Sequence, residues 1–210
     1  MAKNGFALEE GELLVRAARR SIEYAMASGR VMRESAPKSA FTEERGVFVT
    51  LHTFPARELR GCIGYPEPVR PLWNAVLECA VNAAFNDPRF PQLRAGEMDN
   101  VVVEVSVLTR PEPVVLDDET KPEQYLKKIN VGRDGLIAER GAKRGLLLPQ
   151  VAPERGWKEG EFLSQTCRKA GLSTEAWKEK GTKIYSFQAQ VFGETKPKGK
   201  VVEGEQGKVC

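Results

Sequence analysis

The segments GVFVTL (residues 46–51) and LRGCIG (residues 59–64) decide how the fold of this chain is predicted. The first is a run of β-branched and aromatic residues, which is typical of a strand, and the second fits its antiparallel partner. The residues between them suffice for a strand end and a turn near Ala56. Together the two segments predict a β-hairpin.

The register that this turn implies sorts the hairpin side chains by chemistry. Thr50 is expected opposite Cys62, and His52 opposite Arg60. Because successive strand side chains alternate between faces, these four polar residues share one face. The other face carries large aliphatic residues only: Val47, Val49, Leu51 and Ile63. A slip of one residue would mix the two sets, so their separation supports this register.

Helices and strands follow one another in mixed order along the rest of the chain. Apolar spacing of three and four residues predicts helices over 10–26, 71–85 and 158–170, with shorter ones near 125–129 and Trp177. Alternating or β-branched runs predict strands over 99–108, 135–139, 145–148 and 185–191. The run DNVVVEVSVL (99–108) is the strongest strand signal, and its polar face carries Glu104 and Ser106.

Composition argues for a globular protein and against a dedicated nucleic-acid binder. The 210 residues are 41% hydrophobic and 29% charged, with a net charge of +3. This excess is small and dispersed, whereas a nucleic-acid surface needs a clustered basic face. Charge alone therefore disfavours nucleic acid as the partner, although that alternative stays open.

The scattered cysteines indicate a reducing compartment, and the lack of long apolar runs argues against membrane contact. Cys62, Cys79, Cys167 and Cys210 form no CxxC pair, and His52 is the sole histidine, so we predict neither a metal site nor a cofactor. The first residues have no apolar signal-peptide core, and no run approaches the ~20 apolar residues that cross a bilayer. We expect a cytoplasmic protein without membrane contact, or a nuclear one if the source is eukaryotic.

The polar face of the hairpin offers catalytic chemistry. A guanidinium beside a thiol favours the thiolate, so Cys62 is a candidate nucleophile, with His52 as its base. Arg60 could instead grip a carboxylate or phosphate of a ligand with two hydrogen bonds. Gly61 and Gly64 leave room for a ligand, or another backbone, to approach closely.

Each of these residues also has a purely structural interpretation. A lone cysteine such as Cys62 is most often a small buried apolar group. The two neighbouring glycines could serve a β-bulge, and His52 could simply sit at a strand end. Both interpretations remain open from the sequence.

Two further segments carry candidate ligand-binding residues. In DPRFP (87–91), Asp87, Arg89 and Phe90 could present a rigid loop beside LRGCIG; alternatively, Asp87 caps a backbone group, Arg89 pairs with it and Phe90 fills the core. Glu104 and Ser106 are the third candidate site. A buried glutamate needs a partner, which Arg60 or Arg89 could supply.

Several segments together resemble one known family. They are GVFVTL (46–51), LRGCIG (59–64), NAAFNDPRFPQL (82–93), VEVSVL (103–108), GLLLPQVAPERGW (145–157) and FLSQTCRKAGL (162–172). In this order they resemble the AMMECR-type domain family, named for a human chromosomal region linked to Alport syndrome and midface hypoplasia. The resemblance spans about residues 8–194, and LRGCIG followed by DPRFP is highly specific.

The resemblance implies a fold and a setting but no reaction. It implies an α+β fold with mixed, largely antiparallel sheets and flanking helices. These form two unequal, closely associated lobes of one composite domain over 8–194, followed by a polar tail at 195–210. The family's biochemical activity is unestablished, and in some microbes such domains look linked to Memo-type and radical-SAM proteins.

Three functions are left as hypotheses, and whether the chain is an enzyme is undecided. The first is a small-ligand-binding or catalytic cleft around LRGCIG, acting with Memo-type or radical-SAM proteins. The second is a non-catalytic protein-interaction module. The third is a nucleic-acid-associated factor of transcription, repair or translation. The expected partner is accordingly a small molecule or another protein.

Overall fold

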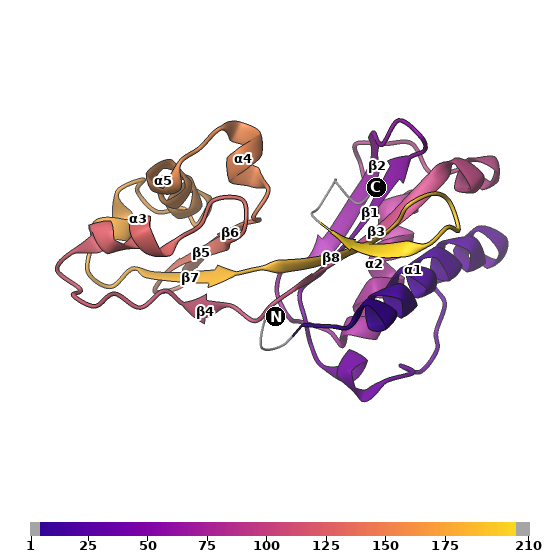
Figure 1. Ribbon diagram of the computed structural model, residues 1–210, viewed down its shortest axis with the longest axis horizontal. Helices are drawn as coiled ribbons and strands as arrows, with labels where there is room; N and C mark the ends of the chain where they lie inside the picture. Colours follow the sequence, from indigo (N-terminus) through magenta and orange to yellow (C-terminus); the bar gives the residue numbers. More distant parts are fainter. Residues whose placement is uncertain (1–4, 205–210) are drawn as a thin grey trace. The chain divides into compact units, whose positions relative to one another are not determined.

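The computed structural model describes residues 5–204, and the chain divides into two compact units. The first comprises the residues up to Thr109 together with those from Gln190 onward, and the second is Arg110–Ala189. Each unit combines helices with one sheet, so the predicted α+β class is confirmed (Figure 1). Largely antiparallel sheets were expected, and antiparallel pairs dominate both sheets.

The first unit is a five-stranded sheet with two long helices on one face. Its strands, in the spatial order β2-β1-β3-β8-β9, are β2 (Leu59–Tyr65), β1 (Val47–Thr53), β3 (Val101–Leu108), β8 (Ala189–Glu194) and β9 (Val201–Gly204). Helix α2 (Leu72–Phe85) covers β1 and β2, and α1 (Leu8–Ser28) covers β3 and β9 and packs on α2. Two 3-10 helices, η1 (Ser39–Thr42) and η2 (Ala95–Asn100), complete it.

The core of this unit lies between the sheet and the two helices. The aliphatic face predicted for the hairpin is buried there, with Val47, Val49 and Leu51 fully enclosed. Helix α2 is apolar on most sides because it is sandwiched between α1 and the sheet. Helix α1 ends, as predicted, at Gly29, which adopts the left-handed conformation (φ 69°) that favours glycine.

The hairpin register is confirmed at Thr50 and wrong at His52. Thr50 lies opposite Cys62 as predicted, but His52 lies opposite Leu59, because the register shifts between Leu51 and His52. Arg60 is the extra residue of this bulge. Bulges bend a strand and redirect a side chain, and turn length alone could not reveal this one.

The second unit is a four-stranded sheet with short helices. Its strands, in the order β4-β7-β5-β6, are β4 (Glu112–Pro113), β7 (Lys183–Phe187), β5 (Gly135–Arg140) and β6 (Lys143–Leu147). Its helices are η3 (Pro122–Gln124), α3 (Tyr125–Lys128), α4 (Val151–Arg155), α5 (Glu159–Lys169) and η4 (Ala176–Lys178). The second predicted hairpin is β5–β6. The single strand predicted over 185–191 is in fact β7 and β8, which belong to different sheets.

The segment predicted as a polar tail from residue 195 is partly folded. The Thr195 amide donates to the Lys200 carbonyl and the Gly199 amide to the Lys196 carbonyl, which closes a turn. Strand β9 then pairs with β8, and Val201 is buried in the core. The prediction of a tail rested on polar composition, which does not reveal the turn or the burial of Val201. Residues 205–210 lie outside the described residues.

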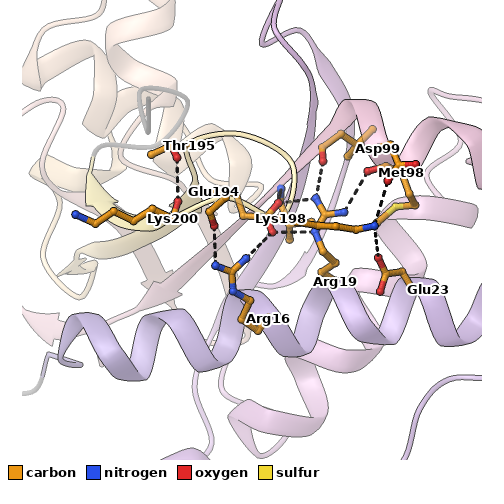
Figure 2. A network of polar contacts seen from close by, with 12 residues as sticks. Arg16, Arg19, Glu23, Met98, Asp99, Glu194, Thr195, Lys198 and Lys200 are labelled. Atoms are coloured by element: carbon orange, nitrogen blue, oxygen red, sulfur yellow. Dashed lines mark hydrogen bonds and ion pairs between the residues drawn. The ribbon is translucent and has the colours of Figure 1, made fainter.

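A buried ion pair joins α1 to this C-terminal hairpin (Figure 2). The Arg19 guanidinium donates to both carboxylate oxygens of Glu194, at 2.8 and 2.5 Å, and to the carbonyls of Met98 and Val101. Arg16 donates to the same carboxylate at 3.1 Å. The Glu194 side chain is fully buried and that of Arg19 is 5% exposed, so every group in this network depends on its partners.

Removing one partner of this pair should be costly. We expect Arg19→Met to lower the free energy of unfolding by about 3–5 kcal/mol, because it leaves a buried carboxylate short of its counter-charge. Arg20→Met is the matched control, since Arg20 pairs with Glu34 in solvent and such pairs contribute about 0–1 kcal/mol. Urea unfolding measures both. Equal losses in the two variants would contradict the structural role of Arg19.

Candidate functional site

The LRGCIG segment forms β2, which is an edge strand of its sheet. At an edge, every second residue presents an unpaired backbone donor and acceptor. At Cys62 these two groups are occupied by the DPRFP loop: the amide donates to Asp87 Oδ2 at 2.9 Å, and the carbonyl accepts from Arg89 Nη2 at 3.2 Å. The loop after α2 thus takes the place of a sixth strand at this point.

Asp87 and Arg89 are fixed by one another. Arg89 donates from Nε and Nη2 to the two carboxylate oxygens, at 3.0 and 2.7 Å, and its backbone amide donates to Oδ1. The Arg89 hydrogen bonds hold the pKa of the Asp87 carboxyl well below its usual range, against the effect of burial. Asp87 therefore binds a backbone group and pairs with Arg89, as the structural interpretation of DPRFP predicted. Phe90 is half-buried under the Arg89 guanidinium rather than in the core.

Arg60 is engaged within the protein. Its guanidinium donates to both carboxylate oxygens of Glu97, at 3.1 and 3.2 Å, and to the Pro91 carbonyl at 2.9 Å. The two arginines that were expected to pair with Glu104 form ion pairs with other residues. Arg60 pairs with Glu97, and Arg89 pairs with Asp87. The bulge directs the Arg60 side chain to η2.

The two glycines of the motif accommodate other parts of the protein. A Cβ built on Gly61 would lie 2.1 Å from the Ala83 carbonyl oxygen of α2, so this glycine permits close packing of a helix on the sheet. A Cβ on Gly64 would lie 2.4 Å from the Phe48 ring. The space that both glycines leave is therefore filled by other parts of the chain rather than by a ligand.

The Cys62 thiol lies in a polar but not an activating environment. Because Cys62 and Thr50 form a pair whose backbone groups point away from each other, their side chains are close, and Thr50 Oγ1 donates to Cys62 Sγ at 3.3 Å. Burial raises the pKa of the Cys62 thiol, and the charges of Asp87 and Glu104 act in the same direction. The Thr50 hydrogen bond and Arg89 oppose this rise without reversing it. The predicted activation by Arg60 is absent from these causes.

His52 does not form a catalytic pair with Cys62. Burial, and then the charge of Arg57, lower the pKa of the His52 imidazole, so it is neutral at pH 7. Within residues 5–204, no hydrogen bond joins His52 to Cys62. The bulge places Leu59, and not Arg60, opposite His52.

Glu104 extends the polar set across the sheet. Thr50 lies opposite Cys62 on one side and opposite Glu104 on the other, so these three form a row across β2, β1 and β3, here called the thiol–carboxylate row. Ser106 lies two residues further along β3. Glu104 and Ser106 are 3% and 1% exposed, and Cys62 is half-buried.

The strands that contain Thr50, Cys62 and Glu104 were predicted correctly from the sequence. The role of Glu97 as the partner of Arg60 was not predicted. The pairing of Glu97 with Arg60 spans 37 residues, and Glu97 stands in a 3-10 turn with no periodic signal. In the part of the chain that the structure describes, no cluster of three or more His, Cys, Asp and Glu side chains could hold a metal ion. Nor is any helix within residues 5–204 long and apolar enough to cross a membrane.

Comparison with known proteins gives one consistent result. The AMMECR1 family model matches residues 15–192. A protein of Methanocaldococcus jannaschii is 53% identical over 196 residues, covering 93% of this chain and 96% of its own. One of Thermofilum pendens is 54% identical, with 93% and 94% covered. The crystal structure of an uncharacterized protein from Pyrococcus horikoshii is similar, with a TM-score of 0.76 and 48% identity over 94% of this chain and 97% of that one.

The thiol environment predicts a slow, alkaline titration of Cys62. We expect its alkylation by iodoacetamide to follow an apparent pKa above the value of about 8.5 for a free cysteine, since burial and two carboxylates disfavour the thiolate. Glu104→Gln should lower that apparent pKa by removing one carboxylate. Site-resolved mass spectrometry between pH 6 and 10 measures it, with urea-unfolded protein as the reference. An apparent pKa below 8.5 would restore the nucleophile hypothesis.

The Asp87 carboxylate predicts a pH-dependent contribution to stability. A carboxyl whose folded pKa is depressed stabilises the fold above its unfolded value of about 3.9, and the contribution disappears as pH falls through the folded pKa. Asp87→Asn should therefore cost about 1.5–3 kcal/mol at pH 7 and progressively less below about pH 4. Unfolding measured at pH 7, 5 and 3 tests this, with exposed Asp99→Asn as control. A pH-independent cost would contradict it.

Proposed function

This chain belongs to the AMMECR1 family, and we propose that it binds a small ligand that is positively charged or rich in hydrogen-bond donors. The proposed site is the thiol–carboxylate row of Cys62, Thr50 and Glu104, together with Ser106. On this proposal, the DPRFP loop (87–91) and Arg60 position this site from outside and do not touch the ligand. On this proposal Cys62 is a neutral binding group and not a nucleophile.

The balance of charge around Cys62 carries the proposal. Asp87 and Glu104 both act on the Cys62 thiol as negative charges, and among the described residues Arg89 acts on it as a positive charge. Arg60 is neutralised by Glu97, and His52 is neutral at pH 7 because its pKa is lowered. The formal sum of two carboxylates and one guanidinium is negative, which complements a cation or a donor.

A second observation concerns Ser106. Its hydroxyl oxygen is buried and has no hydrogen-bond partner among the described residues. Buried hydroxyls nearly always have one, because an unmade bond costs about 1–3 kcal/mol. Ser106 and Glu104 point to the same face of β3, so the two groups belong to one polar set.

The same charge balance bears on the other hypotheses. A surface for nucleic acid needs positive potential, so a negative row argues against one at this place. The association with Memo-type or radical-SAM proteins stays part of the proposal, because a protein that binds a small ligand without a catalytic pair of its own would suit delivery to, or protection of, an enzyme's substrate.

The test uses two small aliphatic probes of opposite charge. We expect n-butylammonium, and not n-butyrate, to shift the backbone amide resonances of Cys62 and Glu104 saturably in nuclear magnetic resonance titrations of the full chain. Glu104→Gln should weaken this binding roughly tenfold, which corresponds to about 1.4 kcal/mol. Glu58→Gln removes the same charge at an exposed position of the hairpin turn and should leave affinity unchanged. Equal responses to both probes, or equal effects of both substitutions, would refute the proposal.

A further inference from the structure

The second unit contains a cavity of about 470 Å³ whose walls include no residue of the thiol–carboxylate row. These walls come from the segment after β4, from η3 and α3, and from the stretch between η4 and β7. Small-molecule sites are typically about 300–1,000 Å³ and mostly apolar. Tyr125, Trp177 and Ile184 are among the apolar residues that line this cavity, and all three belong to the core of the unit.

The charged residues at the cavity divide into paired and unpaired groups. Lys178 pairs with Glu175 at 2.6 Å and lies 4.9 Å from the centre of the Trp177 ring. Glu179 pairs with Arg140 at 2.5 Å. The remaining lining charges are Glu119, Lys180 and Lys183.

These remaining groups leave an excess of one positive charge. Neither Lys180 nor Lys183 has an ion-pair partner in the described part of the chain, and both are exposed. Glu119 opposes one of them in formal charge. A site with this balance complements a monoanion better than a dianion or a cation.

A buried hydroxyl lies beside the two lysines in sequence. Thr182 is one of the residues that line the cavity, and its Oγ1 atom is buried without a hydrogen-bond partner within residues 5–204. A hydroxyl donates strongly to a carboxylate oxygen, and leaving it unpaired in the interior costs about 1–3 kcal/mol. The cavity thus combines an apolar floor, an unpaired donor and a positive rim.

From these features we propose that the cavity binds a small organic acid with an aromatic or branched apolar body and a single carboxylate. The body packs against Tyr125 and Trp177. The carboxylate accepts the Thr182 hydroxyl proton in a hydrogen bond and lies between the ammonium groups of Lys180 and Lys183. Because the lining residues all belong to the second unit, this inference is independent of the function proposed for the thiol–carboxylate row.

Phenylacetate and phenethylammonium test the inference, since they share a ring and differ in the sign of their charge. The chain has three tryptophans, Trp73, Trp157 and Trp177, so the indole N–H signals of the ¹⁵N-labelled protein are few. We expect phenylacetate to shift the Trp177 signal saturably and to leave that of Trp73 unmoved. Phenethylammonium should shift neither. Trp177→Phe assigns the signal.

Matched variants separate the proposed contacts from general charge effects. The double variant Lys180→Ser, Lys183→Ser should weaken phenylacetate binding at least tenfold, and Thr182→Val should weaken it several-fold while preserving side-chain shape. Lys127→Ser combined with Lys169→Ser removes the same charge from exposed positions of the same unit outside the cavity and should change nothing. The inference is overturned if phenylacetate leaves Trp177 unmoved at about 10 mM, a concentration that would detect even millimolar binding. Equal shifts with phenethylammonium, or equal losses in both double variants, overturn it as well.

Discussion

The first unit depends on the ion pair between Arg19 and Glu194. One guanidinium in the middle of α1 holds the end of β8 and the carbonyls of Met98 and Val101, while the Glu194 carboxylate also accepts the Val103 amide. Helix, C-terminal hairpin, η2 and β3 therefore meet at one buried charge pair (Figure 2). Because such a pair repays its desolvation only with good geometry, the elements it touches have little freedom to shift independently.

This constraint extends to the thiol–carboxylate row through η2 and the hairpin turn. Arg19 fixes the Met98 carbonyl within η2, and Glu97 of η2 holds Arg60. At the same end of the sheet, Arg57 of the hairpin turn donates to the Glu194 and Thr195 carbonyls. The backbone next to the polar row is thus held at this end of the sheet by contacts from α1, η2 and the hairpin turn, and a rigid frame favours a preformed binding site.

The sequence predicted the features that arise from local periodicity and missed those that depend on distant partners. In β3, Val103 and Val105 alternate with polar residues, and in α2 apolar residues recur at helical spacing. Each pattern reflects one element packing on a core, so each could be predicted from the sequence. Arg60, the extra residue of the bulge, pairs with the distant Glu97, and Val201 of the segment after Glu194 is buried in the core. Neither contact has a local signature. The raised pKa of Cys62 was missed for the same reason, since it results first from burial of the thiol and then from the charges of Asp87 and Glu104, and not from the nearby Arg60.

The two motifs that identify the family are largely explained by structure. LRGCIG and DPRFP meet because the Cys62 backbone needs Asp87 and Arg89 at an edge, and Gly61 is glycine because α2 comes within contact of the sheet there. A motif that seals an edge needs no reaction to account for it. Edge sealing leaves unexplained the side chain of Cys62 and the polar residues beyond it, Glu104 and Ser106, where aliphatic residues would pack better. The row, and not the motif, is therefore the reason to propose binding.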